Sequence, residues 1–230
     1  MRFIGEAIRD YSMIVPGDRI MIGLSGGKDS LLLSLALAVL RRRSPVKFGL
    51  SATLIDQTGG TMETVKVKEC MDELEIPLSI FNHPTFSIME EREERSPCSL
   101  CANLRRGILA GQAKEAGANV LALGHHKDDA VETVLLNLFY GGRFKCYQPN
   151  MLMSRTEIRV IRPLLYIEER RIALEAERLK LPVTSSCCPY SGKSKRLSAK
   201  KILEEMEKEI PEIKSNVIHA LKNVLDSDVW

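Results

Sequence analysis

Short apolar runs and helical stretches alternate along the chain from its start to about residue 180. The apolar runs predict strands at residues 19–24, 48–56, 78–82, 119–123 and 159–165. Apolar positions with a helical spacing predict helices at residues 1–14, 29–43, 62–74, 99–116, 129–139 and 167–179. This alternation is typical of an α/β fold, so we expect an open parallel sheet with helices on both faces.

The remaining segments fit neither pattern. The charged residues 90–95 predict a solvated helix or loop, and residues 143–157 predict an irregular segment rich in basic and polar side chains. The chain after residue 185 begins with a cysteine turn, continues through the basic residues 193–201 and ends with one or two helices. No internal repeat or low-complexity linker divides the chain. We therefore expect a main domain over residues 1–185 and a small helical appendage over residues 186–230.

Two adjacent glycines lie where the first predicted strand gives way to a helix, in the stretch Ser25-Gly26-Gly27-Lys28-Asp29-Ser30. A glycine turn lets backbone N–H groups gather around an anion, and the following helix directs its free amides and positive dipole end to the same point. Lys28 adds a mobile positive charge, and both serines add hydroxyl donors. Asp29 can help to hold an anion only through a metal ion, so ATP with Mg²⁺ fits the whole set. The alternative, a glycine turn capped by Ser and Asp, explains fewer of these residues.

Composition narrows the class of protein. A chain of 230 residues with 44% hydrophobic content is long and apolar enough for a real core. A net charge of only +3 means that contact with nucleic acid must come from local basic clusters. Charged residues within the first helix exclude a secretory signal, and no uncharged run is long enough to span a membrane. We expect a cytoplasmic protein, in which the six cysteines are thiols or metal ligands.

A second polar stretch, Gly124-His125-His126-Lys127-Asp128-Asp129, follows the fourth predicted strand. Ligands of parallel sheets lie at the carboxyl ends of the strands, so this stretch should face the first glycine loop. Two imidazoles beside two carboxylates can position phosphates, hold Mg²⁺ or transfer protons. The alternative is a helix cap by Asp128 or Asp129, with Glu132 completing a capping box. A cap does not require two histidines, which favours a role in an active site.

The cysteines form two groups. Cys98 and Cys101 form a C-x-x-C at a helix start, where free amides stabilise thiolates, and Cys187 and Cys188 are adjacent. Redox pairs, zinc sites, iron–sulfur sites and simple burial all remain open for such a pair. Adjacent cysteines fit a tetrahedral site of four thiolates poorly, so three protein ligands are the easier arrangement. Cys70 and Cys146 are expected to be single thiols.

Taken together, these motifs resemble the tRNA 2-thiocytidine synthetase family of PP-loop ATP pyrophosphatases. The resemblance rests on the loop at 25–30, on Pro97-Cys98-Ser99-Leu100-Cys101 with Leu104-Arg105-Arg106-Gly107, on the stretch at 123–129, and on Asn137-Leu138-Phe139-Tyr140-Gly141-Gly142. It implies that ATP activates the C2 oxygen of an anticodon-loop cytidine as an adenylate, that pyrophosphate is released, and that sulfur then displaces AMP. In one respect the chain departs from the family: Tyr190 stands where the second C-x-x-C would end.

The resemblance also assigns roles to residues of this chain. It implies a 4Fe-4S cluster on Cys98, Cys101 and Cys187 or Cys188, catalytic roles for Lys28, Asp29 and Asp129, and ATP binding by Ser25, Gly26, Gly27, Lys28, Asp29, Ser30, Asp56, Gly124 and His125. The candidates for tRNA binding, with a merely solvated face as the alternative, are Arg105, Arg106, Arg143, Lys145, Lys195 and Arg196. The implied sulfur donor is a cysteine desulfurase system or free sulfide, and the chain is a possible homodimer.

Three other functions remain to be separated from this one. A related enzyme could make 2-thiouridine. An amidating or lysidine-forming ligase of the same fold would need no C-x-x-C. A nucleotide-binding redox sensor would bind ATP without releasing pyrophosphate in the presence of tRNA.

Overall fold

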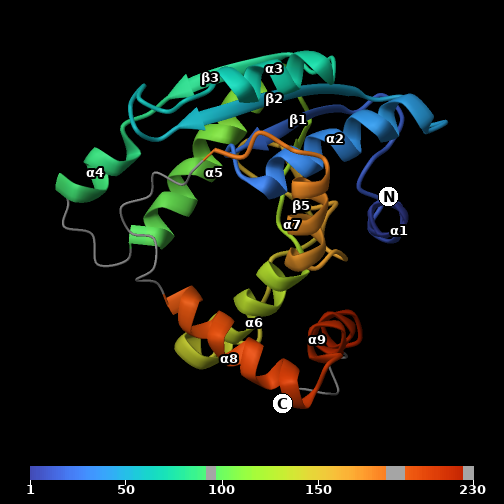
Figure 1. The fold of residues 1–230 in the computed structure, drawn as a ribbon, viewed down its shortest axis with the longest axis vertical. Coiled ribbons are helices and arrows are strands. Elements are labelled where there is room, and N and C mark those ends of the chain that lie inside the picture. Colours follow the sequence, from blue (N-terminus) through green and yellow to red (C-terminus); the bar gives the residue numbers. More distant parts are fainter. Residues whose placement is uncertain (92–96, 185–194, 225–230) are drawn as a thin grey trace.

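The computed structural model describes residues 1–91, 97–184 and 195–224 (Figure 1). These residues form one six-stranded sheet in the order β3-β2-β1-β4-β6-β5. The strands are β1 (Arg19–Leu24), β2 (Gly49–Asp56), β3 (Leu78–Asn82), β4 (Val120–Ala122), β5 (Asn150–Leu152) and β6 (Arg159–Ile161). Every neighbouring pair is parallel except β5 with β6, which is antiparallel. The predicted α/β sheet is confirmed, with one antiparallel edge strand inside the segment that was expected to be irregular.

The helices also follow the predicted order. They are α1 (Arg2–Asp10), α2 (Lys28–Arg43), α3 (Val65–Glu73), α4 (Thr85–Glu91), α5 (Pro97–Glu115), α6 (Lys127–Gly141), α7 (Glu169–Arg178), α8 (Lys195–Glu209) and α9 (Ile213–Lys222). Helix α6 begins two residues earlier than expected because His126, rather than an aspartate, is its N-cap. The His126 side chain accepts from the Asp129 amide, and the Asp129 carboxylate accepts from the His126 amide. The predicted capping box therefore exists with different partners.

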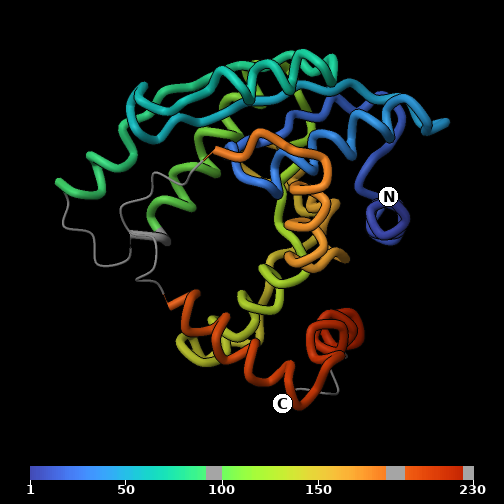
Figure 2. The backbone as a smooth tube through the Cα atoms, in the orientation of Figure 1, coloured from blue at the N-terminus to red at the C-terminus, as the bar shows by residue number. Residues whose placement is uncertain are grey.

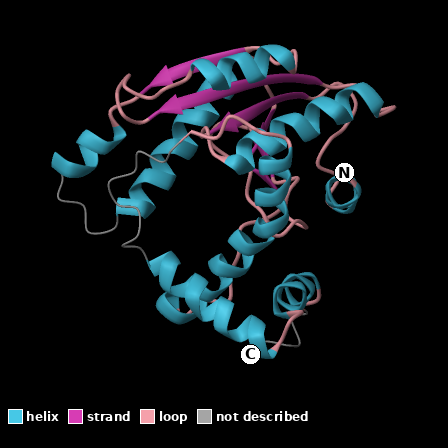
Figure 3. Ribbon diagram, viewed as in Figure 1, coloured by secondary structure: helices cyan, strands magenta, loops and turns pink. Residues whose placement is uncertain are grey.

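Side chains that alternate along the central strand β1 divide the core into two layers. Ile20, Ile22 and Leu24 pack into a cluster with buried residues of α1, α2, α3 and α7. Met21 points to the opposite face and packs with Leu109 and Ala113 of α5. Because successive strand side chains point to opposite faces, β1 is buried on both sides, as its continuous apolar run predicts. Figure 3 shows the strands side by side with helices above and below them.

A third cluster lies beyond the sheet. Helix α6 leads away from the sheet to α8 and α9, as the tube in Figure 2 shows. Val131 and Leu135 of α6 are buried there with Leu203 of α8 and Ile218 of α9. The C-terminal helices thus pack on α6. The expected boundary at residue 185 falls in 185–194, which lie outside the described residues, and it stays a prediction.

The strand order places a switch point next to β1. Helix α2 follows β1 and the connection continues to β2 on one side, whereas β4 pairs with β1 on the other side. In such sheets, the loops after the two diverging strands leave a crevice at the carboxyl edge where ligands bind. Those two loops are residues 25–30 after β1 and residues 124–129 after β4. We call them the phosphate loop and the Gly124 loop.

Candidate active site

The phosphate loop is a tight turn with an open helix start. Gly26 has φ +73°, a left-handed conformation that glycine adopts without strain. The Ser30 hydroxyl donates to the Gly27 carbonyl at 3.0 Å and accepts from the Ser25 amide at 3.2 Å, which closes the turn. Gly27 is the N-cap of α2 and brings no side chain to occupy the first amides of the helix. Those amides and the helix dipole are therefore available to an anion, as the sequence predicts.

Lys28 lies in an ion-pair network that joins three helices. Its Nζ is 2.9 Å from Glu169 Oε1 at the start of α7, and Glu169 Oε2 is 2.7 Å from Lys200 Nζ on α8. Burial alone would lower the pKa of Lys28, but the hydrogen bond to Glu169 and the nearby carboxylates raise it. Burial alone would raise the pKa of Glu169, but its bonds to Lys200 and Lys28 lower it to about 2. All three groups are therefore charged near neutral pH.

Asp29 has a buried carboxylate oxygen that can still accept a hydrogen bond or bind a metal ion. Lys28 Nζ is 3.2 Å from Asp29 Oδ1, but the alignment is not that of a hydrogen bond. Among the described residues this buried oxygen accepts no hydrogen bond, and His126 Nε2 is 3.9 Å from it. An orphaned carboxylate oxygen beside a phosphate-binding turn is a suitable ligand for Mg²⁺. Within the described part of the chain, no three His, Cys, Asp or Glu side chains are grouped to bind a metal ion.

The Gly124 loop packs directly on the phosphate loop. A Cβ at Gly124 would lie 3.1 Å from the Asp29 carbonyl carbon and 3.2 Å from the Ser30 nitrogen, so a side chain there would press on the backbone of the phosphate loop. The carboxylates of the Gly124 loop have partners from the C-terminal helices. Asp128 accepts from the Glu169 amide at 2.7 Å and pairs with Lys214 of α9 at 2.9 Å. Asp129 Oδ1 pairs with Arg196 of α8 at 2.7 Å.

Glu132, one turn further along α6, is a buried acid within the same network. It is 5% exposed, and its Oε2 lies 3.5 Å from Arg196 Nη1. Burial raises the pKa of Glu132 to about 7, although Arg196 opposes that change. The group therefore exchanges a proton near neutral pH, next to Asp129.

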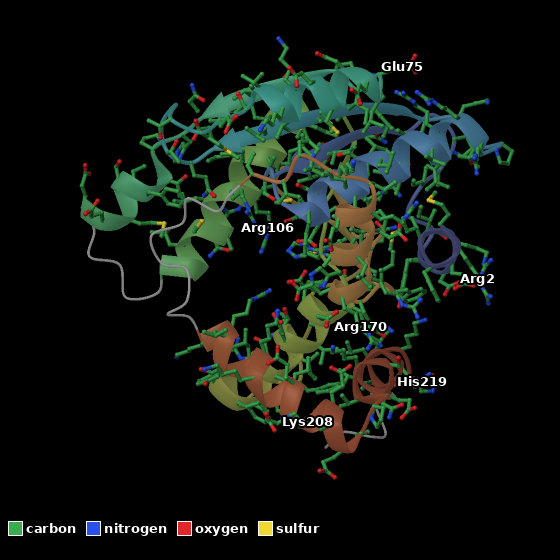
Figure 4. All side chains as sticks on the ribbon, in the orientation of Figure 1. Arg2, Glu75, Arg106, Arg170, Lys208 and His219 are labelled. Atoms are coloured by element: carbon green, nitrogen blue, oxygen red, sulfur yellow. The ribbon has the colours of Figure 1, made fainter. Side chains whose placement is uncertain are left out.

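His125 belongs to a second cluster, with Tyr147 and Arg162. Its ring centroid is 5.1 Å from that of Tyr147, and the Arg162 guanidinium lies 4.5 Å from the Tyr147 centroid. Burial, together with the positive charges of Arg162 and Arg105, lowers the pKa of His125 to about 3, so the imidazole is neutral. Among the described residues His125 Nδ1, Tyr147 OH and Arg162 Nε are buried without a hydrogen-bond partner. Arg106 of α5 contributes positive charge at Arg162, and Figure 4 shows it on the side of α5 that faces the rest of the molecule.

Asp56, the last residue of β2, and Gln57, which follows it, lie at the same edge. Asp56 accepts from the Thr58 amide at 2.8 Å and from the Thr58 hydroxyl. Burial alone would raise the pKa of Asp56, but these bonds lower it. Asp56 thus fixes the turn after β2. Its predicted position near adenosine stays a prediction.

The first cysteine pair begins α5, at the edge where β2 and β3 end (Figure 1). Cys101 Sγ accepts a hydrogen bond from Gln57 Nε2 at 3.0 Å, so this sulfur lies beside the carboxyl end of β2. The Cys98 backbone lies in the first turn of α5, but its side chain is outside the described residues. Cys187 and Cys188 also lie outside them. The chain that leads to them does reach the site, because the Thr184 amide donates to the Gly26 carbonyl at 3.0 Å.

The remaining cysteines and the basic candidates are divided among several places. Cys70 and Cys146 are free and partly buried, and burial raises the pKa of Cys146 to about 11, so it is a thiol. Of the predicted tRNA contacts, Arg196 pairs inside the site, whereas Arg143, Lys145 and Lys195 are exposed near the end of α6. Arg105 and Arg106 are on α5.

The residues of the site without a role predicted from the sequence are Gln57, Tyr147, Arg162, Glu169, Thr184 and Lys214, whereas Lys200 was expected only as part of the basic segment 193–201. Each of these residues contacts a residue of the site that is distant from it in the sequence. The only signal for Glu169 was its position at a helix start, where acidic residues are common for electrostatic reasons alone.

Comparisons with known proteins agree on the family. The model of the PP-loop domain matches residues 4–182. A tRNA-cytidine(32) 2-sulfurtransferase from Pelobacter propionicus is 43% identical over 96% of this chain and 84% of its own length. The enzyme of the same name from Geobacter metallireducens is 41% identical over 96% of this chain and 88% of its own length.

One solved structure is also similar. It is the U34-tRNA thiolase NcsA from Methanococcus maripaludis with its 4Fe-4S cluster, which has a TM-score of 0.76 and 26% sequence identity. The match covers 97% of this chain and 80% of that one. Among the described helices, none has the length and apolarity needed to cross a membrane. By its domain match and its relatives, the chain belongs to the tRNA-cytidine 2-sulfurtransferase family of PP-loop ATP pyrophosphatases.

Proposed function

We propose that this chain uses ATP to replace the C2 oxygen of a tRNA cytidine by sulfur, at position 32 as in the names of its relatives. The observation that carries the proposal is the meeting of three elements at one sheet edge: the phosphate loop, the Gly124 loop and the Cys101 end of α5. The first two are suited to a nucleotide, and the third brings a thiol to the same edge. A ligase that only adenylates its substrate would have no use for the thiol.

The phosphate loop would bind the β- and γ-phosphates through Gly26, Gly27, Ser25 and Ser30. Lys28 would leave Glu169 for the phosphates and stabilise the charge that develops on departing pyrophosphate. Asp29, with its free oxygen, would hold Mg²⁺ together with phosphate oxygens, which is the usual way in which this ion is bound. Asp129 is a second candidate ligand, provided that Arg196 releases it.

The cysteines present fit an iron–sulfur cluster. Cys101 accepts a hydrogen bond at its sulfur, in the first turns of a helix whose dipole favours thiolates, and Cys98 lies one turn earlier. Cys187 or Cys188 would be the third ligand, and the chain reaches Gly26 three residues before Cys187. When bound, a 4Fe-4S cluster with three protein ligands supplies one iron at which a sulfur atom can be held. The residues of this chain then keep the adenylated base and that sulfur at the same edge of the sheet.

The nearest competing function is thiolation of uridine 34, because the similar solved structure is a U34-tRNA thiolase. The cytidine enzymes are 41–43% identical to this chain and the uridine enzyme is 26% identical, which favours cytidine. We extend the proposal to a cytoplasmic location, a homodimer, and sulfur supplied by a cysteine desulfurase system or free sulfide.

Anaerobic reconstitution with iron and sulfide, followed by ATP and bulk tRNA, tests the proposal. Mass spectrometry of the digested tRNA should detect 2-thiocytidine, with one pyrophosphate released per modified base. The Cys98→Ala variant should lose both the visible absorbance of the cluster and the thiolated product while it still binds ATP. Cys70→Ala is the matched control, since Cys70 packs against the core away from α5, and it should keep both. The function is wrong if Cys98→Ala thiolates as well as the unaltered protein, and the base is wrong if the product is 2-thiouridine.

A further inference from the structure

A surface of aromatic and basic side chains lies at the end of α6 and the start of α8, outside the site described above. Phe139, Tyr140 and Phe144 are 54, 50 and 50% exposed. Lys195 Nζ lies 4.8 Å from the centre of the Tyr140 ring, which joins the two helices at this surface. We call it the aromatic–basic patch, and it consists of Phe139, Tyr140, Arg143, Phe144, Lys145 and Lys195.

The positive charge of this patch is not balanced locally. Residues 133–149 and 195–203 contain no Asp or Glu, although the chain has 30 acidic residues. The basic residues of the active site, in contrast, pair with carboxylates at 2.7–2.9 Å. Among the described residues, no carboxylate pairs with Arg143, Lys145 or Lys195. The patch therefore presents both exposed rings and unneutralised cations to a ligand.

The backbone of the patch is held in place. Helix α6 ends at Gly142 in the left-handed conformation, with φ +58°. The Arg143 amide donates to the Asn137 carbonyl at 3.0 Å, and the Asn137 side chain donates to the Lys145 carbonyl at 2.8 Å. These bonds tie the turn that carries Arg143 and Phe144 to the last turn of α6. A fixed backbone lowers the entropic cost of binding.

Exposed rings interleaved with cations match the chemistry of unpaired nucleotides. Single-stranded bases stack on aromatic side chains while Lys and Arg contact their phosphates. Double-stranded RNA offers no free base faces and is bound mostly through its backbone and shape. Tyr140 is eleven residues after Asp129 on the same helix, about 16 Å along the axis, so nucleotides that flank a base in the active site could reach the patch.

We propose that the aromatic–basic patch binds the unpaired loop nucleotides next to the target base, with stacking on Tyr140 and Phe144 and phosphate contacts to Arg143 and Lys195. This inference rests on the proposed tRNA substrate and adds a loop-recognition surface at the far end of α6. The distance along α6 between the patch and the active site then helps to select which loop nucleotide enters the active site.

Binding of two RNA probes tests the inference. The probes are a hairpin with the sequence of an anticodon stem and loop, and a blunt duplex of equal length. Fluorescence anisotropy without ATP should show that Tyr140→Ala and Phe144→Ala each weaken hairpin binding about ten-fold or more. Duplex binding should change little, and Tyr140→Phe should retain hairpin affinity because the ring remains. Phe3→Ala is the matched control, since Phe3 on α1 is 40% exposed and lies under the Arg171 guanidinium at 5.3 Å.

The salt dependence separates the two kinds of contact. Arg143→Ala and Lys195→Ala should each reduce the slope of log K against log salt by about 0.7, the value for a single-strand phosphate contact. Tyr140→Ala should weaken binding without altering that slope. Far-UV circular dichroism and ATP binding like those of the unaltered protein confirm that each variant is folded.

Two results would overturn the inference. One is hairpin affinity that is unchanged in both Tyr140→Ala and Phe144→Ala. The other is a change of oligomeric state in these variants while hairpin affinity stays the same, which would make the patch a protein interface. Because the binding assay needs no thiolation, its result is independent of the proposed reaction. A protein that binds the hairpin through the patch but thiolates no tRNA would contradict the reaction and leave the patch assignment standing.

Discussion

Glu132 allows a quantitative test of the electrostatics around the active site. Its pKa rises from 4.5 to about 7, mainly because the carboxyl group is buried. Each pH unit of that difference corresponds to about 1.4 kcal/mol, so ionised Glu132 costs the folded state about 3 kcal/mol at pH 8. Replacement by the isosteric, uncharged glutamine removes this cost.

The sign of the pH dependence follows from the direction of the pKa change. Between pH 4.5 and 7 the folded protein holds a proton on Glu132 that the unfolded chain has lost, so stability falls as the pH rises. Glu132→Gln should therefore be more stable than the unaltered protein by about 1 kcal/mol at pH 5 and about 3 kcal/mol at pH 8. Urea unfolding followed by circular dichroism at several pH values between 5 and 8 measures both differences.

A surface glutamate serves as the control for this test. Glu205 is 72% exposed and pairs with Lys208 on the same helix, so Glu205→Gln should change stability by less than about 1 kcal/mol at every pH. Lys208 lies near the C-terminal end of α8 (Figure 4), whereas Arg196, the partner of Glu132, is the second residue of that helix. A Glu132→Gln variant that is less stable than the unaltered protein at pH 8 would refute the reasoning, as would a difference that does not depend on pH.

Three further substitutions test other parts of the site. Glu169→Gln should lower the unfolding free energy at pH 7 by about 1–2 kcal/mol, after allowance for solvent screening. The difference should shrink as the pH falls from about 4.5 towards 2, because Lys28 and Lys200 stabilise only the ionised carboxylate. Gly26→Ala should weaken ATP binding at least ten-fold in a filter assay, since Gly26 has φ +73° and its Cβ would clash with the Thr184 side chain. Gly107→Ala, which meets nothing within 4 Å in α5, should bind ATP normally and unfold at a slightly higher temperature. Lys28→Ala should keep the visible absorbance of the cluster but release pyrophosphate at least ten-fold more slowly, and an unchanged rate would remove Lys28 from the phosphate site.

Local patterns were sufficient to predict most of the fold. Continuous apolar runs located β1, β2, β3, β4 and β6 within a few residues; in β1, β2 and β4 the reason is that strands buried on both faces need apolar side chains throughout, whereas β3 lies at the edge of the sheet and is largely exposed. The strand β5 was missed because it pairs at the edge of the sheet and none of its side chains is fully buried, so it needs no continuous apolar run. Its formation depends on β6, which supplies the hydrogen bonds, rather than on its own sequence.

The site was predictable where a motif contained its own chemistry. The phosphate loop and the Gly124 loop were expected to face each other, and the contact of Gly124 with Asp29 confirms this. The ion pairs between Lys28 and Glu169 and between Asp129 and Arg196 were not predicted, because each joins helices far apart in the chain. The sequence around a charged residue on an amphipathic helix does not show whether its side chain forms a buried ion pair or is exposed to solvent.

Gly23, three residues before the tightest turn of the phosphate loop, determines how closely α5 can approach the sheet. A side chain there would lie 2.9 Å from one Leu109 methyl carbon and 3.0 Å from a Leu123 methyl carbon. Leu109 is eight residues after Cys101, about 12 Å along the axis of α5. The contact of Leu109 with Gly23 therefore helps to set the angle at which α5 packs on the sheet. A methyl group at Gly23 would push Leu109 away from the sheet, tilt α5 and move Cys101 relative to Gln57. The absence of a side chain at Gly23, in the middle of β1, therefore contributes to the position of the Cys101 sulfur at the carboxyl edge of the sheet.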